Sequence, residues 1–134
     1  MNSSGKTTAR MDVRVLLSTL WIVVMINMLY ADVLGLFIPG ALDEVARTAG
    51  ETPIPLLMLG AAVMMEISTA MIILSRVLKH RVNRWANIIA SLITIAFVVG
   101  GGSQHPHYIF IATIEVVCLL AILWNAWKWS SPER

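Results

Sequence analysis

Four long apolar segments, separated by short polar stretches, dominate the pattern along the chain. They cover about residues 15–38, 56–78, 85–99 and 108–127. A helix needs about 20 mostly apolar residues to cross the hydrocarbon core of a bilayer. The pair Pro39-Gly40 ends the first segment, and three consecutive glycines from Gly100 end the third. The pattern therefore predicts an all-α fold, an integral membrane four-helix transmembrane bundle.

The four spans leave little chain for anything else, so we expect residues 13–129 to form a single four-span membrane domain. Residues 1–12 are polar and lack apolar periodicity, which predicts a flexible cytoplasmic tail, and residues 130–134 form a short cytoplasmic C-terminal tail. The first apolar run is too long for a cleaved signal peptide, so we expect it to be retained. Residues 40–55 leave room for one short amphipathic turn.

The composition supports a membrane protein and narrows the function classes. The chain is 57% hydrophobic and only 13% charged, whereas soluble domains are about a quarter charged. Membrane lipid is therefore the main expected partner, and the net charge of +2 gives no reason to expect a nucleic-acid partner. The single cysteine, Cys118, excludes an internal disulfide and a CxxC redox pair. We expect no cofactor.

The distribution of Lys and Arg predicts the orientation, because cytoplasmic loops are enriched in both residues. Nine of the ten fall on one side of the predicted topology: Lys6, Arg10, Arg14, Arg76, Lys79, Arg81, Arg84, Lys128 and Arg134. Only Arg47 falls on the other side. We therefore predict a multi-pass protein of the cell (inner) membrane with both termini in the cytoplasm.

Three acidic residues, Asp32, Glu66 and Glu115, lie inside the predicted spans, where an ionisable side chain costs a few kcal/mol. At 1.5 Å per residue they lie roughly 9, 17 and 11 Å below the outer boundary. Each shares a helix face with small or polar residues, so the simplest packing turns all three inward to a common site. With no Lys or Arg at this depth, burial and mutual repulsion favour the neutral form, and we expect at least one carboxyl to be protonated near neutral pH.

Three further residues complete the candidate ligand- or proton-binding site: Asn27, Thr69 and Tyr108. Thr69 and Tyr108 fall on the same helix faces as the acids of their own spans. Asn27 is more simply explained as a hydrogen-bonding contact between helices, and so are Asn87 and Thr94 on the third span, which has no acid.

The loop between the third and fourth spans contains His105 and His107, which could bind a metal together with a third ligand. Their spacing is unlike that of a zinc motif. We therefore expect a solvated loop and no metal site.

Nearly everything after residue 11 resembles a family of small bacterial four-span membrane proteins known as a domain of unknown function. The matching features are Ala31-Asp32, Pro39-Gly40, Glu66, Ser75-Arg76, Asn83-Arg84, Asn87 and Glu115. The chain is also loosely similar to four-helix DoxX-like membrane proteins in size and span number. These resemblances imply the architecture and carry no activity with them.

Three function hypotheses remain open. The first is a protein that binds or carries a proton and a small amphipathic or cationic ligand at a carboxylate cluster open to the outer side, working as a homodimer because four helices are few for a transport pathway. The second is a membrane enzyme acting on a lipophilic, isoprenoid-like substrate, with one carboxyl as acid and another as base. The third is a structural or accessory subunit. We rank the first highest, and an enzyme is the less expected outcome.

Overall fold

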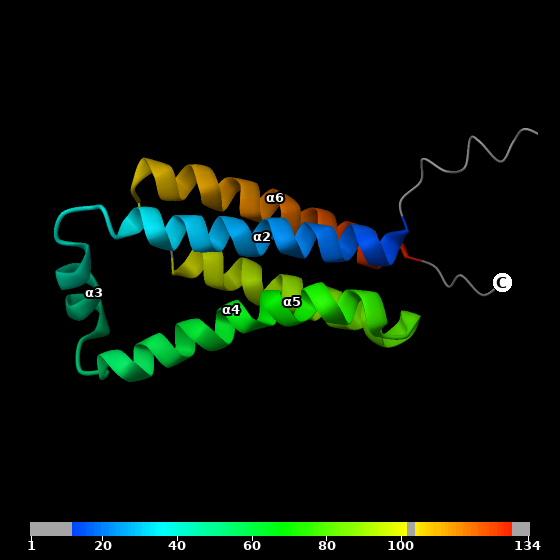
Figure 1. Ribbon diagram of the computed structural model, residues 1–134, viewed down its shortest axis with the longest axis horizontal. Coiled ribbons are helices and arrows are strands. Elements are labelled where there is room, and N and C mark those ends of the chain that lie inside the picture. Colours follow the sequence, from blue (N-terminus) through cyan, green and yellow to red (C-terminus); the bar gives the residue numbers. More distant parts are fainter. Residues whose placement is uncertain (1–11, 102–103, 130–134) are drawn as a thin grey trace, which may run out of the picture.

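The computed structural model describes residues 12–101 and 104–129, which form five helices and no strand (Figure 1). The helices are α2 (Val13–Gly35), α3 (Ala41–Ala49), α4 (Ile54–Val77), α5 (His80–Gly100) and α6 (Pro106–Lys128). All except α3 are long and apolar enough to cross a membrane. The expected all-α fold with four membrane-compatible helices is confirmed. The expected tails lie outside the described residues, apart from Asp12.

The helix ends follow from local sequence. The Asp12 side chain caps α2 by accepting a hydrogen bond from the backbone N–H of Arg14 at 3.0 Å. Both α4 and α6 carry proline in their first turn, where the missing N–H leaves no hydrogen bond unmade. The helix α5 begins at His80, whereas we expected the third span to begin at about residue 85. The turn between α4 and α5 is therefore very short.

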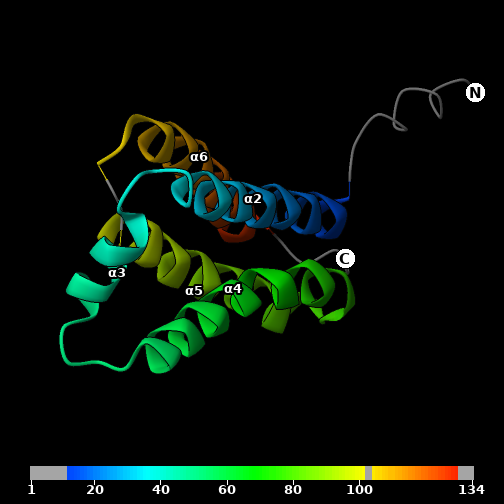
Figure 2. The same ribbon diagram turned by 60° about the vertical axis from the view of Figure 1, so that its left-hand side comes forward.

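The helix α3 is longer than the single amphipathic turn that the sequence suggested. It has nine residues and lies across the ends of α2 and α4 (Figures 1 and 2). Gly40 (φ 81°) and Gly50 (φ 59°) bound it, and both adopt positive φ angles that side-chain-bearing residues avoid. Asp43 and Glu44 in its first turn interact favourably with the helix dipole.

The four long helices form a ring in which each packs against two neighbours. The helix α2 lies between α4 and α6, and α5 lies between the same two helices on the other side. Figures 1 and 2 both show α2 and α6 side by side. The core is made of side chains spaced three or four residues apart, including Leu17, Trp21, Val24, Leu119 and Ile122, all fully buried.

The helix α4 departs from this close packing over its first half. Residues 51–60 are all exposed, and the buried residues of α4 are Ser68, Met71 and Ser75, all in its second half. Both ribbon views show α4 diverging from α2 toward the α3 end of the molecule (Figures 1 and 2). The bundle is therefore closed at the end where α4 meets α5, which we call the inner half. It is more open at the α3 end, the outer half.

Candidate functional site

Glu115 is the acid that the fold places in the core. It lies on the buried stripe of α6 between Ile111 and Leu119, and only 2% of its surface is exposed. Its Oε1 atom is buried and has no hydrogen-bond partner among the described residues. A buried carboxyl oxygen without a partner is unusual, because burying a polar group costs free energy unless a hydrogen bond compensates.

Asp32 and Tyr108 are the other candidate residues that lie in the outer half with Glu115. Asp32 lies near the outer end of α2, Tyr108 lies in the first turn of α6, and α2 packs against α6. Asp32 is exposed at the edge of the bundle, whereas Glu115 is enclosed. The two acids therefore form a pair in the outer half with different access to the surroundings.

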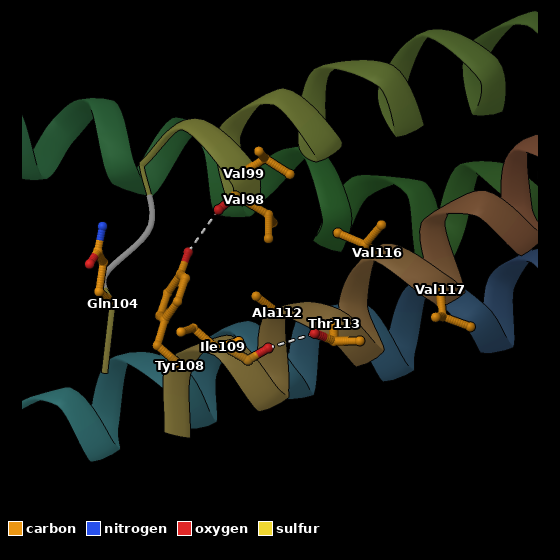
Figure 3. A pocket seen from close by; sticks show the side chains of 9 residues that line it. All are labelled: Val98, Val99, Gln104, Tyr108, Ile109, Ala112, Thr113, Val116 and Val117. Carbon is orange, nitrogen blue, oxygen red and sulfur yellow. Dashed lines mark hydrogen bonds between the residues drawn. The ribbon is translucent and has the colours of Figure 1, made fainter. Parts of the chain in front are cut away.

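Tyr108 lies two helical turns before Glu115 and borders a pocket of about 460 Å³ between the outer ends of α5 and α6 (Figure 3). Its hydroxyl donates a hydrogen bond to the backbone carbonyl of Val98 at 3.0 Å. The pocket is lined mainly by apolar side chains, including Val98, Ala112 and Val116. The Thr113 hydroxyl on its wall already donates to the Ile109 carbonyl at 2.7 Å. The pocket therefore suits an apolar group more than a charged one.

Glu66 does not join this pair, and the expectation that its helix face turns inward is wrong. The buried residues Ser68, Met71 and Ser75 follow Glu66 by two, five and nine positions, which places them roughly 140° to 200° around the helix at about 100° per residue. Glu66 itself is exposed. The physical reason is that hydroxyls with partners on other helices, rather than the small residues beside Glu66, determine the packed face of α4.

Asn27 and Thr69 also lie outside the pair, and each forms a hydrogen bond within its own helix. The Asn27 amide donates to the carbonyl of Val23 at 2.8 Å. The Thr69 hydroxyl donates to the carbonyl of Met65 at 3.2 Å. Both side chains are half-buried. Of the six candidate residues, the structure thus brings together Asp32, Tyr108 and Glu115.

The inner half contains a buried polar cluster outside the predicted site, formed by Trp21, Ser75, Asn83 and Asn87. Both the indole N–H of Trp21 (2.8 Å) and the hydroxyl of Ser75 (3.2 Å) donate to Oδ1 of Asn87. The Asn87 amide donates to Oδ1 of Asn83 at 2.7 Å, and the Asn83 amide donates to the Ser75 carbonyl at 2.7 Å. All four side chains are fully buried. The cluster joins α2, α4 and α5.

Arginines extend these contacts to the inner ends of the helices. Nε of Arg76 donates to the Ser18 hydroxyl at 3.0 Å, and that hydroxyl donates to the Ile72 carbonyl at 2.8 Å. Arg84 donates to the carbonyls of Ala126 and Trp127, both at 3.0 Å, at the end of α6. The sequence signal for this cluster was the alignment of Asn87, Ser91 and Thr94 on one face of the third span, with Asn83 one turn earlier.

The outer-loop histidines His105 and His107 lie side by side. The rings of His105 and His107 stack with their centroids 6.0 Å apart. Among residues 12–101 and 104–129, no three His, Cys, Asp or Glu side chains are close enough to hold a metal ion.

Comparison with known proteins finds one relationship. A model of a family of unknown function (DUF6326) matches residues 8–134, which is almost the whole chain. No curated protein and no solved structure matches the chain. This match shows that the chain belongs to the family of unknown function DUF6326.

Proposed function

We propose that this protein binds a proton at Glu115 and carries it together with a small amphipathic or cationic ligand. The observation that carries the proposal is the enclosed Glu115 carboxyl, with one oxygen that no described residue satisfies. A group of this kind is poised to exchange a proton for a ligand, because its neutral form is tolerated in the core and its charged form needs a counter-charge.

Asp32 supports a route between Glu115 and the outer side. It is exposed, and it lies near the outer end of α2, the helix that packs against α6. Two carboxyls on neighbouring helices of an apolar bundle cannot easily both be charged, so a cation or a proton bound at one would affect the other. In this proposal Asp32 receives the ligand or proton and Glu115 holds it.

The pocket beside Tyr108 supports an amphipathic ligand. Its mostly apolar wall would take the apolar part of a ligand, while the cationic part would reach the acidic pair. Tyr108 connects the two parts of the proposed site, since it borders the pocket and lies on α6 two helical turns before Glu115.

The structural alternative explains the acids less well. The inner polar cluster already joins three helices through amides, hydroxyls and an indole without using any acid. The Oε1 atom of Glu115 makes no hydrogen bond to any described residue and so holds no helix in place. An acid/base enzyme acting on a lipophilic substrate would use the same carboxyl pair, and the experiment below separates it from a carrier.

Purified protein in sealed liposomes, with a pH-sensitive dye inside, tests the proposal directly. An outward concentration gradient of tetraphenylphosphonium, a lipophilic cation, should drive proton movement across the membrane. Glu115→Gln should abolish this proton movement because the amide cannot exchange a proton. Glu51→Gln, the same substitution in the loop between α3 and α4, should leave it unchanged.

Infrared spectroscopy gives a second readout that does not depend on the choice of ligand. The carbonyl band of a protonated carboxylic acid should be present in the wild-type protein and in Glu51→Gln at neutral pH. It should lose intensity in Glu115→Gln. Full proton movement in Glu115→Gln, or an unchanged band, would show that Glu115 is not the proton-binding group. Turnover of a lipophilic substrate in detergent without any gradient would instead favour the enzyme.

We also propose that the protein lies in the bacterial inner membrane with both termini in the cytoplasm. Six of the seven Lys and Arg residues in the described chain lie at the inner end of the bundle: Arg14, Arg76, Lys79, Arg81, Arg84 and Lys128. Fusing alkaline phosphatase to the C-terminus should give an inactive reporter, whereas insertion after Gly50 should give an active one.

A further inference from the structure

Glu66 is an ionisable residue on the exposed face of a membrane-compatible helix. It lies midway along the 24-residue α4, about 18 Å from either end at 1.5 Å per residue, which is near the centre of a bilayer. It is exposed on the side of α4 opposite the buried face. In a lone copy of the protein, an ionisable side chain would therefore face lipid hydrocarbon at the depth where this is least favourable.

The rest of the chain offers Glu66 no described partner. Thr69, one turn away, already donates its hydroxyl to Met65. The basic residue on the same helix, Arg76, is about 15 Å further along the axis and donates its Nε to Ser18. Acids within membrane spans almost always face a bundle interior or pair with another group. We therefore expect a second protein surface to pack against Glu66.

The residues around Glu66 indicate which kind of surface packs against it. Ala62 and Ala70 lie four residues before and after Glu66, both are exposed, and so all three share one face of α4. The face therefore carries one small residue on each side of the acid, and small residues let two membrane helices approach closely. Larger apolar side chains continue this face toward both ends: Leu59, Ile73 and Val77, each at least 60% exposed.

We propose that this face of α4, Ala62-Glu66-Ala70, is the interface of a homodimer with Glu66 paired to Glu66 of a second copy. Two copies in the same membrane orientation can meet about a two-fold axis along the membrane normal, which brings each residue of this face opposite itself and places the two Glu66 side chains at the same depth. A neutral carboxyl both donates and accepts a hydrogen bond, so two of them satisfy each other without any further group.

The sparse packing of α4 fits this arrangement. The first half of the helix is exposed within its own chain, and a second α4 alongside it would give it a protein neighbour. The interface is separate from Asp32 and Glu115, which lie on α2 and α6. The proposal therefore stands or falls independently of the proton-carrying function.

Energy transfer between fluorescently labelled copies in liposomes, measured over a range of protein-to-lipid ratios, tests the dimer. The wild-type protein should associate. Glu66→Leu and Ala70→Leu should each raise the dissociation constant by about tenfold or more. Glu66→Gln, which keeps a donor and an acceptor, should retain most of the association. Ala96→Leu, on an exposed position of α5, is the matched control and should have no effect.

Cysteine cross-linking in native membranes provides a test that does not require a large side-chain change. In a Cys118→Ser background, Ala62→Cys should form a disulfide-linked dimer of this chain, and Ala96→Cys should not. The proposal is overturned if the wild-type protein is monomeric at every lipid ratio, if Ala96→Cys cross-links as readily as Ala62→Cys, or if Ala62→Cys cross-links only to a different protein.

Discussion

The inner and outer halves of the bundle differ in whether their buried polar groups have hydrogen-bond partners. In the inner half, Asn83, Asn87 and Ser75 are fully buried and hydrogen-bonded across or along the helices. In the outer half, Glu115 is nearly as deeply buried, yet its Oε1 atom has no partner among the described residues. Satisfied buried polar groups hold a fold together, whereas an unsatisfied one costs stability. In the function that we propose, the inner half supplies structure and the outer half binds the proton and the ligand.

The α4 helix shows the same contrast along its own length. Its second half packs through Ser68, Met71 and Ser75, and its first half is exposed. Glu66 lies at the junction, facing away from the bundle. Three substitutions test this contrast between the two halves of the bundle, and the expected loss of stability decreases from the first to the last.

The largest effect is expected for Asn87→Leu in the inner cluster. Leucine would leave the indole N–H of Trp21 and the hydroxyl of Ser75 without their acceptor on Asn87. The free energy of unfolding should fall by about 2–3 kcal/mol, since each polar group left unpaired costs on the order of 1 kcal/mol. Unfolding by SDS in mixed micelles measures this change.

Asn125→Leu is the matched control for that substitution. Asn125 is half-buried and donates only to the Ala121 carbonyl of its own helix, at 2.7 Å. Its replacement should cost less than about 1 kcal/mol. If both substitutions destabilise the protein equally, the inner cluster has no special role in holding α2, α4 and α5 together.

A smaller loss is expected for Arg84→Gln at the inner boundary. The substitution removes the two hydrogen bonds to the Ala126 and Trp127 carbonyls at the end of α6. Water can replace part of this interaction near the membrane surface, so we expect a loss of about 1 kcal/mol in unfolding free energy. Thermal unfolding in detergent measures it. Arg81→Gln, at an exposed position of the same helix, should change the midpoint little, and an equal shift would contradict a capping role for Arg84.

The smallest effect on stability is expected for Glu115→Gln, despite the deep burial of Glu115. The amide has the same shape as the acid, and Oε1 has no hydrogen bond to lose within the described chain. The free energy of unfolding should change by less than about 1 kcal/mol at neutral pH, in the same SDS assay. A loss as large as that of Asn87→Leu would show that Glu115 is a structural group, and the contrast between the two halves would fail.

Part of the candidate site could be predicted from the sequence. Tyr108 and Glu115 were expected on one face of the last span, and the structure places both in the outer half with Asp32 nearby. The direction in which Glu66 faces could not be predicted from helical periodicity. The helix α4 is apolar almost all round, so its sequence has no clear polar side to mark the surface that faces its neighbours.

The sequence predicted only part of the inner cluster. Asn87 was expected to hydrogen-bond between helices, and the structure confirms that it accepts from Trp21 and Ser75. Its dependence on Asn83 was not foreseen, because Asn83 lies in the segment that we assigned to the loop before the third span. Starting that span at residue 80 would have placed both amides on one helix face.

The number of membrane-compatible helices follows from the sequence alone, because the length of an apolar run relates directly to the thickness of the bilayer. The presence of three acids within those helices follows from it as well. Which acid is enclosed and which faces outward depends on the packing of the bundle, because the packing sets how each helix is rotated against its neighbours. Contacts between residues distant in the chain, such as that of Trp21 with Asn87, fix that rotation, and helical periodicity alone does not specify them.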